Sequence, residues 1–188
     1  MLFLLKRTWP GGLVGLAVLA ALGFGLRALL ADAPQPTVSA TAALLGIGLF
    51  GVVVTSDVLL HGTFCLTFGE PYKRRHRELA AVFRGQTTAA ILAGAAMAGV
   101  GEELVFRGLS LSPYYLAGAA VVFGVLHHIR RSLWPFTLWA IWQGLLLAAG
   151  LYCTRNLFVT MEAHFLHDLA GFLIFRTLNR RGWQKAPV

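Results

Sequence analysis

Long runs of apolar residues, separated by short polar segments, dominate the pattern of this chain. A helix that crosses a bilayer needs about 20 mostly apolar residues, and several of these runs reach that length. We predict six membrane-spanning helices, at about Gly11–Ala31, Ala40–His61, Gln86–Glu103, Tyr115–His128, Trp134–Tyr152 and Leu157–Phe175. The pattern therefore predicts an all-α fold, a polytopic membrane helical bundle that forms one integral membrane domain over residues 1–188.

The segment between the second and third spans is basic rather than uniformly apolar. Charged side chains are mixed with apolar ones in this segment. The charged ones include Lys73, Arg74, Arg75, Arg77 and Arg84, and the apolar ones include Leu79, Val82 and Phe83. A helix with both kinds of side chain is suited to the membrane surface. Residues Tyr72–Arg84 are therefore expected to form an amphipathic surface helix.

Composition and charge agree with a membrane protein and indicate its orientation. Hydrophobic residues make up 57% of the chain and charged residues 13%, about half the share in soluble domains. With six spans and both termini in the cytoplasm, only Arg27, Arg107 and Arg155 of the 16 Lys and Arg residues fall on the opposite side. This bias follows the positive-inside rule. The net charge of +8 is thus explained by topology, and nucleic acid is not an expected partner.

Several ionisable residues lie inside the predicted spans, where each costs roughly 2.5–3.5 kcal/mol on insertion scales. They are Glu102, Glu103, Arg107, His127, His128, Glu162, His164, His167 and Asp168, with Asp57 and His61 further away in the sequence. Any one of them can be explained by a hydrogen bond between packed helices. The whole set would require many unrelated costly burials, which favours a functional site.

Helical spacing groups these residues. Glu103 and Arg107 are four residues apart and share a helix face, so Arg107 can neutralise the carboxylate, whereas Glu102 points about 100° away and is available as a base. Phe123 and His127 have the same spacing, which places an aromatic wall beside an imidazole. On the last span, His164 and Asp168 repeat it and are expected to project into one cavity.

These segments resemble the motifs of the CPBP (Abi, type II CAAX-protease-like) intramembrane endopeptidases. Residues 102–108, EELVFRG, match the EExxxR motif, and residues 123–127, FGVLH, match FxxxH. Residues 164–168, HFLHD, match the third motif, with Asp168 where the eukaryotic Ras-converting members have Asn. Each motif alone is weak, but three in the same order within hydrophobic spans, over about residues 86–175, are specific.

The resemblance implies a glutamic-type protease that hydrolyses a peptide bond near or within the membrane. It assigns Glu102 as the general base that activates water, with His127 helping to hold that water. His164 and Asp168 would polarise the carbonyl or stabilise its oxyanion, with Asp168 alternatively orienting His164. Glu103, Arg107 and Phe123 would support the site. No cofactor is expected, although Glu102, His127 and His164 could instead hold a zinc ion with a bound water.

The expected substrate is a membrane protein or peptide, with a C-terminal anchor or a CAAX-like tail as candidates, and the expected location is the bacterial inner (cytoplasmic) membrane. Two other functions remain open at this stage. The chain could be a non-catalytic membrane scaffold or immunity protein, or a small proton-coupled transporter. The absence of an inverted sequence repeat argues against a transporter.

Overall fold

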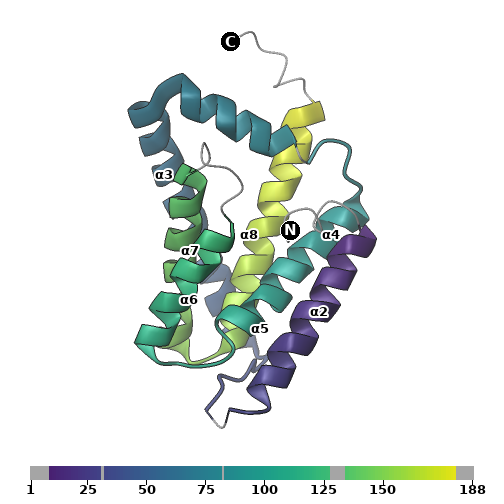
Figure 1. Ribbon diagram of the computed structural model, residues 1–188, viewed down its shortest axis with the longest axis vertical. Coiled ribbons are helices and arrows are strands. Elements are labelled where there is room, and N and C mark those ends of the chain that lie inside the picture. The colour runs from purple at the N-terminus through teal and green to yellow at the C-terminus, as the bar shows by residue number, and fades with distance from the viewer. Residues whose placement is uncertain (1–8, 31, 82, 128–133, 181–188) are drawn as a thin grey trace.

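A computed structural model of the chain describes residues 9–30, 32–81, 83–127 and 134–180, and Figure 1 shows their arrangement as a bundle of helices. The helices in chain order are α2 (Trp9–Arg27), α3 (Ala40–Ala81), α4 (Thr88–Ala96), the π-helix η1 (Met97–Glu102), α5 (Glu103–Phe106), α6 (Pro113–Leu126), α7 (Trp134–Thr154) and α8 (Leu157–Arg180). No strand occurs among the described residues. The predicted all-α membrane bundle is confirmed.

Five of the helical segments are long and apolar enough to cross a membrane. They are Pro10–Arg27, Ala40–Arg74, Thr88–Phe106, Trp134–Thr154 and Leu157–Leu178. The predicted fourth span forms α6, whose 14 residues are apolar but correspond to only about 21 Å of helix. All six predicted helices therefore form, and the fourth is shorter than a full crossing over its described length.

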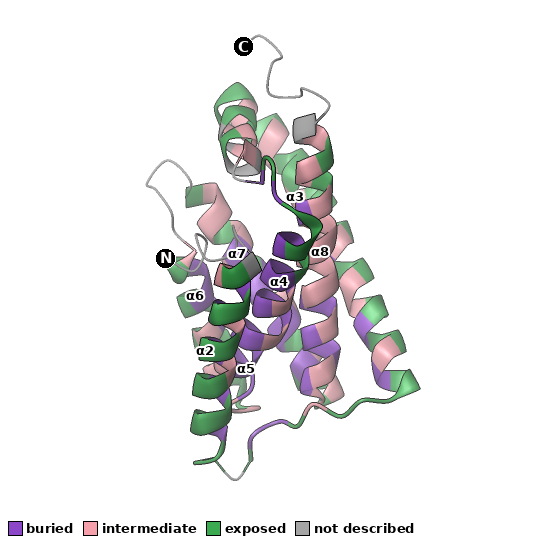
Figure 2. Ribbon diagram, turned by 90° about the vertical axis from the view of Figure 1, so that its right-hand side faces the viewer, coloured by how far each residue is buried: buried purple, intermediate pink, exposed green. Residues whose placement is uncertain are grey.

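The third span is the central one, and α3 lies at the periphery. In an apolar 18-residue window of Thr88–Phe106, 72% of the residues are buried by protein, against 11% in the corresponding window of Ala40–Arg74. Figure 2 shows the buried residues concentrated along α4 and the neighbouring face of α8, while the outer face of α2 is exposed. A membrane helix covered on all sides by protein can carry charged residues without exposing them to lipid.

The central span is not a continuous α-helix. It changes from α4 to η1 at Met97 and returns to α-helical geometry at Glu103, so Gly99 and Gly101 lie within a π-helix. Gly99 faces α8 so closely that an added Cβ would lie 2.5 Å from the Cβ of Phe165. The π-helix, which often marks functional positions, therefore presses against the helix that carries the third motif.

The second span extends beyond its predicted end at His61. Helix α3 continues to Gly69, where φ is 57° and ψ is −139°, and Pro71 follows this kink. A positive φ of this kind is readily adopted only by glycine. The remaining residues, up to Ala81, run across one end of the bundle toward α8 (Figure 1). The predicted amphipathic segment Tyr72–Arg84 is therefore helical as far as Ala81, and it is joined to the second span through the kink. Val82 falls outside the described residues, and Phe83 and Arg84 lie in a turn.

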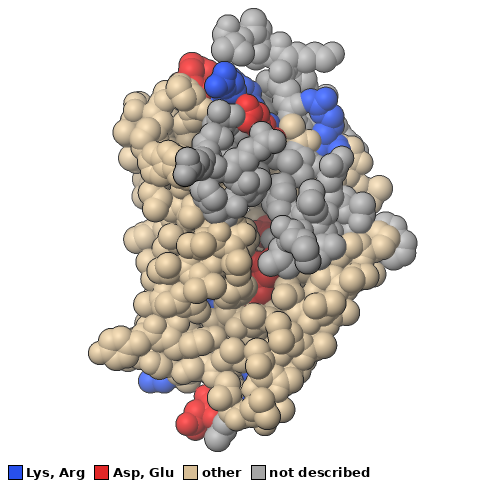
Figure 3. Space-filling model, viewed as in Figure 1, with Lys and Arg blue, Asp and Glu red and all other residues tan. Residues whose placement is uncertain are grey.

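The opposite end of the bundle is fastened by polar contacts between connections. Arg27, at the end of α2, donates to the carbonyl oxygens of Pro34 and Gly108 at 2.6 and 3.0 Å. The Thr37 backbone N–H donates to Asn156 Oδ1 at 2.9 Å. Figure 3 shows charged side chains near the two ends of the visible face and a mostly uncharged band between them. These contacts join the segments that connect the helices at this end. The cytoplasmic location of both termini stays a prediction.

Candidate active site

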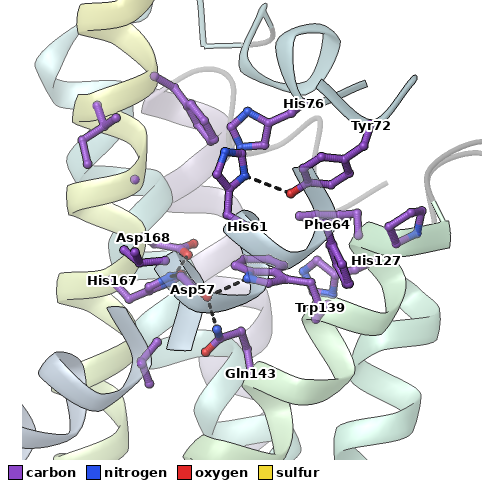
Figure 4. A pocket seen from close by; sticks show the side chains of 18 of the residues that line it. Asp57, His61, Phe64, Tyr72, His76, His127, Trp139, Gln143, His167 and Asp168 are labelled. Atoms are coloured by element: carbon purple, nitrogen blue, oxygen red, sulfur yellow. Dashed lines mark hydrogen bonds and ion pairs between the residues drawn. The ribbon is translucent and has the colours of Figure 1, made fainter. Parts of the chain in front are cut away.

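A cavity of about 910 Å³ lies between α3, α6, α7 and α8, beneath the part of α3 that follows the kink. Aromatic side chains form much of its wall, including Phe64, Phe68, Trp134, Phe136, Trp139, Phe172 and Phe175. Its polar residues include Asp57, His61, His127, His164, His167 and Asp168. Figure 4 shows the histidines and acids converging on this space from different helices. A mostly apolar cavity with a few convergent polar groups has the character of a binding or active site.

A buried ion pair contacts His164, one of the residues that line the cavity. Arg107 Nη1 donates to Glu103 Oε1 at 2.8 Å, and both side chains are fully buried. The same Glu103 oxygen accepts a hydrogen bond from His164 Nδ1, also at 2.8 Å. Arg107 Nη2 donates to the Gly144 carbonyl oxygen at 3.3 Å. The first and third motifs are thus joined through Glu103, which fixes the orientation of the His164 ring.

The second motif contacts the same wall. The Arg107 guanidinium lies 4.6 Å from the centroid of the Phe123 ring, a cation–π contact. The Phe123 ring is also 5.9 Å from the His164 ring and 4.3 Å from the His127 ring, centroid to centroid. Phe123 is therefore the side chain that packs the three motifs against one another, beyond its expected place beside His127.

The two cavity histidines of the motifs are held by their Nδ1 atoms. His127 Nδ1 lies 2.7 Å from the Phe123 carbonyl oxygen, to which it can only donate. His164 Nδ1 lies on the Glu103 carboxylate, and its Nε2 is 4.0 Å from Asp168 Oδ1. In a neutral ring held in this way, Nε2 is the accepting nitrogen. Both rings are thus oriented for proton exchange or hydrogen bonding at Nε2.

The sequence-predicted residues do not all reach the cavity. His127, His164 and Asp168 line it, but Glu102 and Glu103 are not among the described residues that do so. Glu102 is the last residue of η1, and none of its surface is exposed. Of the two neighbouring glutamates, Glu103 is therefore the one hydrogen-bonded to His164, whereas Glu102 does not line the cavity. His128 falls outside the described residues.

A second polar cluster, in which only Asp168 was assigned a catalytic role from the sequence, lies on the cavity wall. Asp57 of α3 accepts hydrogen bonds from Trp139 Nε1 at 2.6 Å and from the Gln143 side chain. His167 Nε2 lies 2.5 Å from Asp57 Oδ2, and its Nδ1 lies 3.5 Å from Asp168 Oδ1 (Figure 4). The signal in the sequence was the presence of Asp57 in an apolar span, but its partners are more than 80 residues away.

The far end of the cavity is formed by residues around the kink of α3. His61 Nδ1 and the Tyr72 hydroxyl are 3.0 Å apart, and the His61 and His76 rings lie 4.7 Å apart, centroid to centroid. Burial, together with the neighbouring His61, lowers the pKa of His76 to about 4. His76 is therefore neutral at physiological pH, and the cavity end beneath the amphipathic segment is mainly aromatic.

The expected alternative zinc ligands do not form a common set. Within the described part of the chain, no three His, Cys, Asp or Glu side chains are arranged to hold a metal ion. His164 directs Nδ1 to Glu103, and Glu102 is buried away from the cavity in which His127 and His164 lie. These residues do not fit a shared zinc ion, and no chemical step is assigned to one.

Comparison with known proteins gives one match. Residues 84–170 match the family model for type II CAAX prenyl endopeptidase Rce1-like proteins. No curated protein and no solved structure matches the chain. The matched segment runs from the start of the central span into α8 and contains all three motifs. Over residues 84–170, this integral membrane protein is therefore similar to the Rce1-like type II CAAX prenyl endopeptidases, the kind of protein that its three motifs indicated.

Proposed function

We propose that this protein is an intramembrane endopeptidase that hydrolyses a peptide bond of a membrane-bound substrate in the cavity between α3, α6, α7 and α8. The observation that supports the proposal most strongly is that residues of all three motifs contact one another beside the cavity. Glu103 accepts from His164, and Phe123 packs on both Arg107 and His164. The match to a prenyl endopeptidase family favours the same reaction class.

In the proposed reaction Glu102 removes a proton from a water molecule, and the water oxygen attacks the scissile carbonyl carbon. Glu102 is fully buried without substrate, so the reaction requires water to reach its carboxyl from the cavity side. Catalytic hydrogen bonds are often long or poorly aligned until substrate binds. His127 holds the attacking water through Nε2, because its Nδ1 is occupied by the Phe123 carbonyl oxygen.

The electron pair of the carbonyl group moves onto its oxygen, and protonated His164 donates from Nε2 to this oxyanion. Glu103 at Nδ1 and Asp168 on the Nε2 side stabilise positive charge on the ring. A donor held in place in a cavity with little water is worth more than one in bulk solvent. When the carbonyl group re-forms and the C–N bond breaks, Glu102 passes its proton to the leaving nitrogen, and the products are a carboxylic acid and an amine, which ionise by proton exchange to a carboxylate and an ammonium group.

The shape of the cavity favours an apolar or lipidated tail as substrate. Phe64, Phe68, Phe172 and Phe175 line it, together with Arg74, whose charge suits a C-terminal carboxylate. The proposed substrate is accordingly a membrane protein or peptide with a C-terminal anchor or a CAAX-like tail, and the proposed location is a bacterial inner membrane.

The test compares two glutamates in purified protein reconstituted in liposomes. Glu102→Gln should lower hydrolysis of a farnesylated CAAX peptide, or of a peptide with a C-terminal apolar anchor, by at least about 100-fold, the usual contribution of a general base. Glu162→Gln is the matched control, because Glu162 lies on α8 and does not line the cavity. Cleavage is followed by mass spectrometry of the products.

Both variants should remain folded, as judged by their thermal unfolding in detergent. Full activity in folded Glu102→Gln would exclude Glu102 as the base. If the wild-type protein cleaves neither peptide, the proposed substrate class is wrong. A proton-dependent solute flux in the same liposomes would instead favour a transporter.

A further inference from the structure

The cluster of Asp57, His167 and Asp168 has no role in the reaction described above except through Asp168. Its members come from two helices, α3 and α8, and α7 supplies Trp139 and Gln143. The side chains of Asp57, His167 and Asp168 are 25%, 14% and 13% exposed, so they border the cavity without being freely solvated. Charged groups in such a place must be balanced by neighbouring charge or hydrogen bonds.

Asp57 is arranged as an ionised carboxylate. One of its oxygens accepts from Trp139 Nε1 and the Gln143 amide, and the other faces His167 Nε2. Trp139 Nε1 and the Gln143 amide nitrogen are donors, and His167 Nε2 donates when it carries a proton, whereas an ionised carboxylate only accepts. Asp57 is therefore held in place by α7 and presents a fixed negative charge to His167.

His167 stands between two carboxylates. Its Nε2 is 2.5 Å from Asp57 Oδ2, and its Nδ1 is 3.5 Å from Asp168 Oδ1. Only a ring that carries a proton on each nitrogen can donate to both. The Trp139 ring lies beside it, with the two centroids 5.8 Å apart, and covers one side of the imidazole. The geometry therefore indicates an imidazolium between Asp57 and Asp168.

Charge balance connects this cluster with the motif wall. Together the two groups contain three carboxylates, those of Asp57, Glu103 and Asp168. Three cations face them when His164 is protonated, namely Arg107, His164 and His167. Removing the charge of His167 would leave Asp57 and Asp168 with one cation fewer in an apolar cavity, at a considerable electrostatic cost.

We propose that Asp57 and His167 are a positioning pair, which compensates the charge of Asp168 and holds its carboxylate beside Nε2 of His164. This role rests on the proposed peptidase function and deepens it. The role depends on the negative charge of Asp168. An Asn needs no cation beside it, whereas an Asp in this cavity does.

The test is a double-mutant cycle on the reconstituted protein. His167→Gln keeps a hydrogen-bond donor but removes the charge, and it should lower kcat about 10-fold or more with KM changed less than about 2-fold. In an Asp168→Asn background the same substitution should have little further effect, because no charge remains at position 168 to be compensated. Independent, multiplied losses in the double variant would indicate a merely structural role and would overturn the proposal.

A spectroscopic measurement tests the same inference without hydrolysis. In protein labelled with ¹⁵N-histidine, the signals lost in His167→Gln should show both ring nitrogens protonated at pH 7. A neutral His167 ring would overturn the proposal. If the wild type hydrolyses the peptide and His167→Gln has the same kcat, the positioning role of Asp57 and His167 is wrong, whereas the peptidase function stands. If the wild type hydrolyses nothing, the peptidase function fails and the positioning role fails with it.

Discussion

Two clusters of charged side chains lie inside this bundle, and they differ in how far they are removed from solvent. Glu103 and Arg107 are fully buried in the central span and are fixed by short contacts to His164 and Gly144. Asp57, His167 and Asp168 border the cavity and are partly exposed. The difference indicates that the first cluster joins the helices, whereas we propose that the second sets the charge at the cavity wall.

The two clusters meet at His164, which bonds Glu103 and lies near Asp168. A histidine whose Nδ1 is held by a buried carboxylate, and whose Nε2 borders a cavity, can form a hydrogen bond to a substrate without moving its backbone. Removal of charge from the buried cluster should therefore affect folding first. Removal of charge from the cavity cluster should affect activity first.

The largest effect is expected for Arg107→Ala. The substitution leaves Glu103 as a buried carboxylate without its cation, which destabilises a protein by about 3–5 kcal/mol. The expected result is a strong loss of folded protein, measured by size-exclusion chromatography and thermal unfolding in detergent. Lys73→Ala is the comparison, because its ion pair with Glu70 at 3.2 Å lies on the surface and should contribute little. Equal stability of the two variants would contradict a joining role for the buried pair.

A smaller effect on stability, with a clear effect on activity, is expected for Asp57→Asn. Asn retains an oxygen that accepts from Trp139 and Gln143, so the helices remain connected. The negative charge opposite His167 is lost, and hydrolysis should fall about 10-fold, as expected when a catalytic group is slightly misplaced. The measurements are kcat and the unfolding midpoint of the same preparation. A variant that unfolds as readily as Arg107→Ala would remove the distinction between the two clusters.

No effect is expected from removal of metal. Glu102, His127 and His164 do not form a ligand set in the described structure, so hydrolysis should be unchanged after dialysis against a chelator. The control is the same preparation after zinc is added back, with its metal content measured. Activity that disappears with the chelator and returns with zinc would require another arrangement of these residues.

The helices could be predicted from the sequence because their signal is local. Each span is an apolar run, which is recognisable within a stretch of about 20 residues. The π-helix around Gly99 and Gly101 was not predicted. The extension of α3 beyond His61 to the kink at Gly69 was not predicted. Polar residues after His61 suggested a connector, whereas in the structure this part of α3 lines and covers the cavity.

Among the contacts of the site, only those between residues of the same helix could be predicted from the sequence. The Glu103–Arg107 pair follows from a separation of four residues, and the structure confirms it. The bond between Glu103 and His164 spans 61 residues, and that between Asp57 and His167 spans 110. Such contacts depend on how the helices pack, which the spacing of residues within one helix does not specify. The catalytic roles of Glu102, His127, His164 and Asp168 stay predictions.

Peptide hydrolysis is proposed to take place in the cavity, and two glycines allow a direct test of this location. Gly171 lines the cavity, and a Cβ added there meets no atom within 4 Å. Gly118 has the same free space but lies on an exposed face of α6 that does not line the cavity. Leucine at either position should not lower stability, because glycine is the poorer helix former by roughly 0.5–1 kcal/mol.

The measurement is kcat/KM for the same membrane-bound peptide in Gly171→Leu and Gly118→Leu, beside the wild type. We predict that the leucine at 171 occupies the space of the substrate and lowers kcat/KM at least about 10-fold, which corresponds to about 1.4 kcal/mol. The leucine at 118 should leave it unchanged. Full activity in a folded Gly171→Leu variant, or an equal loss in both, would contradict hydrolysis in this cavity.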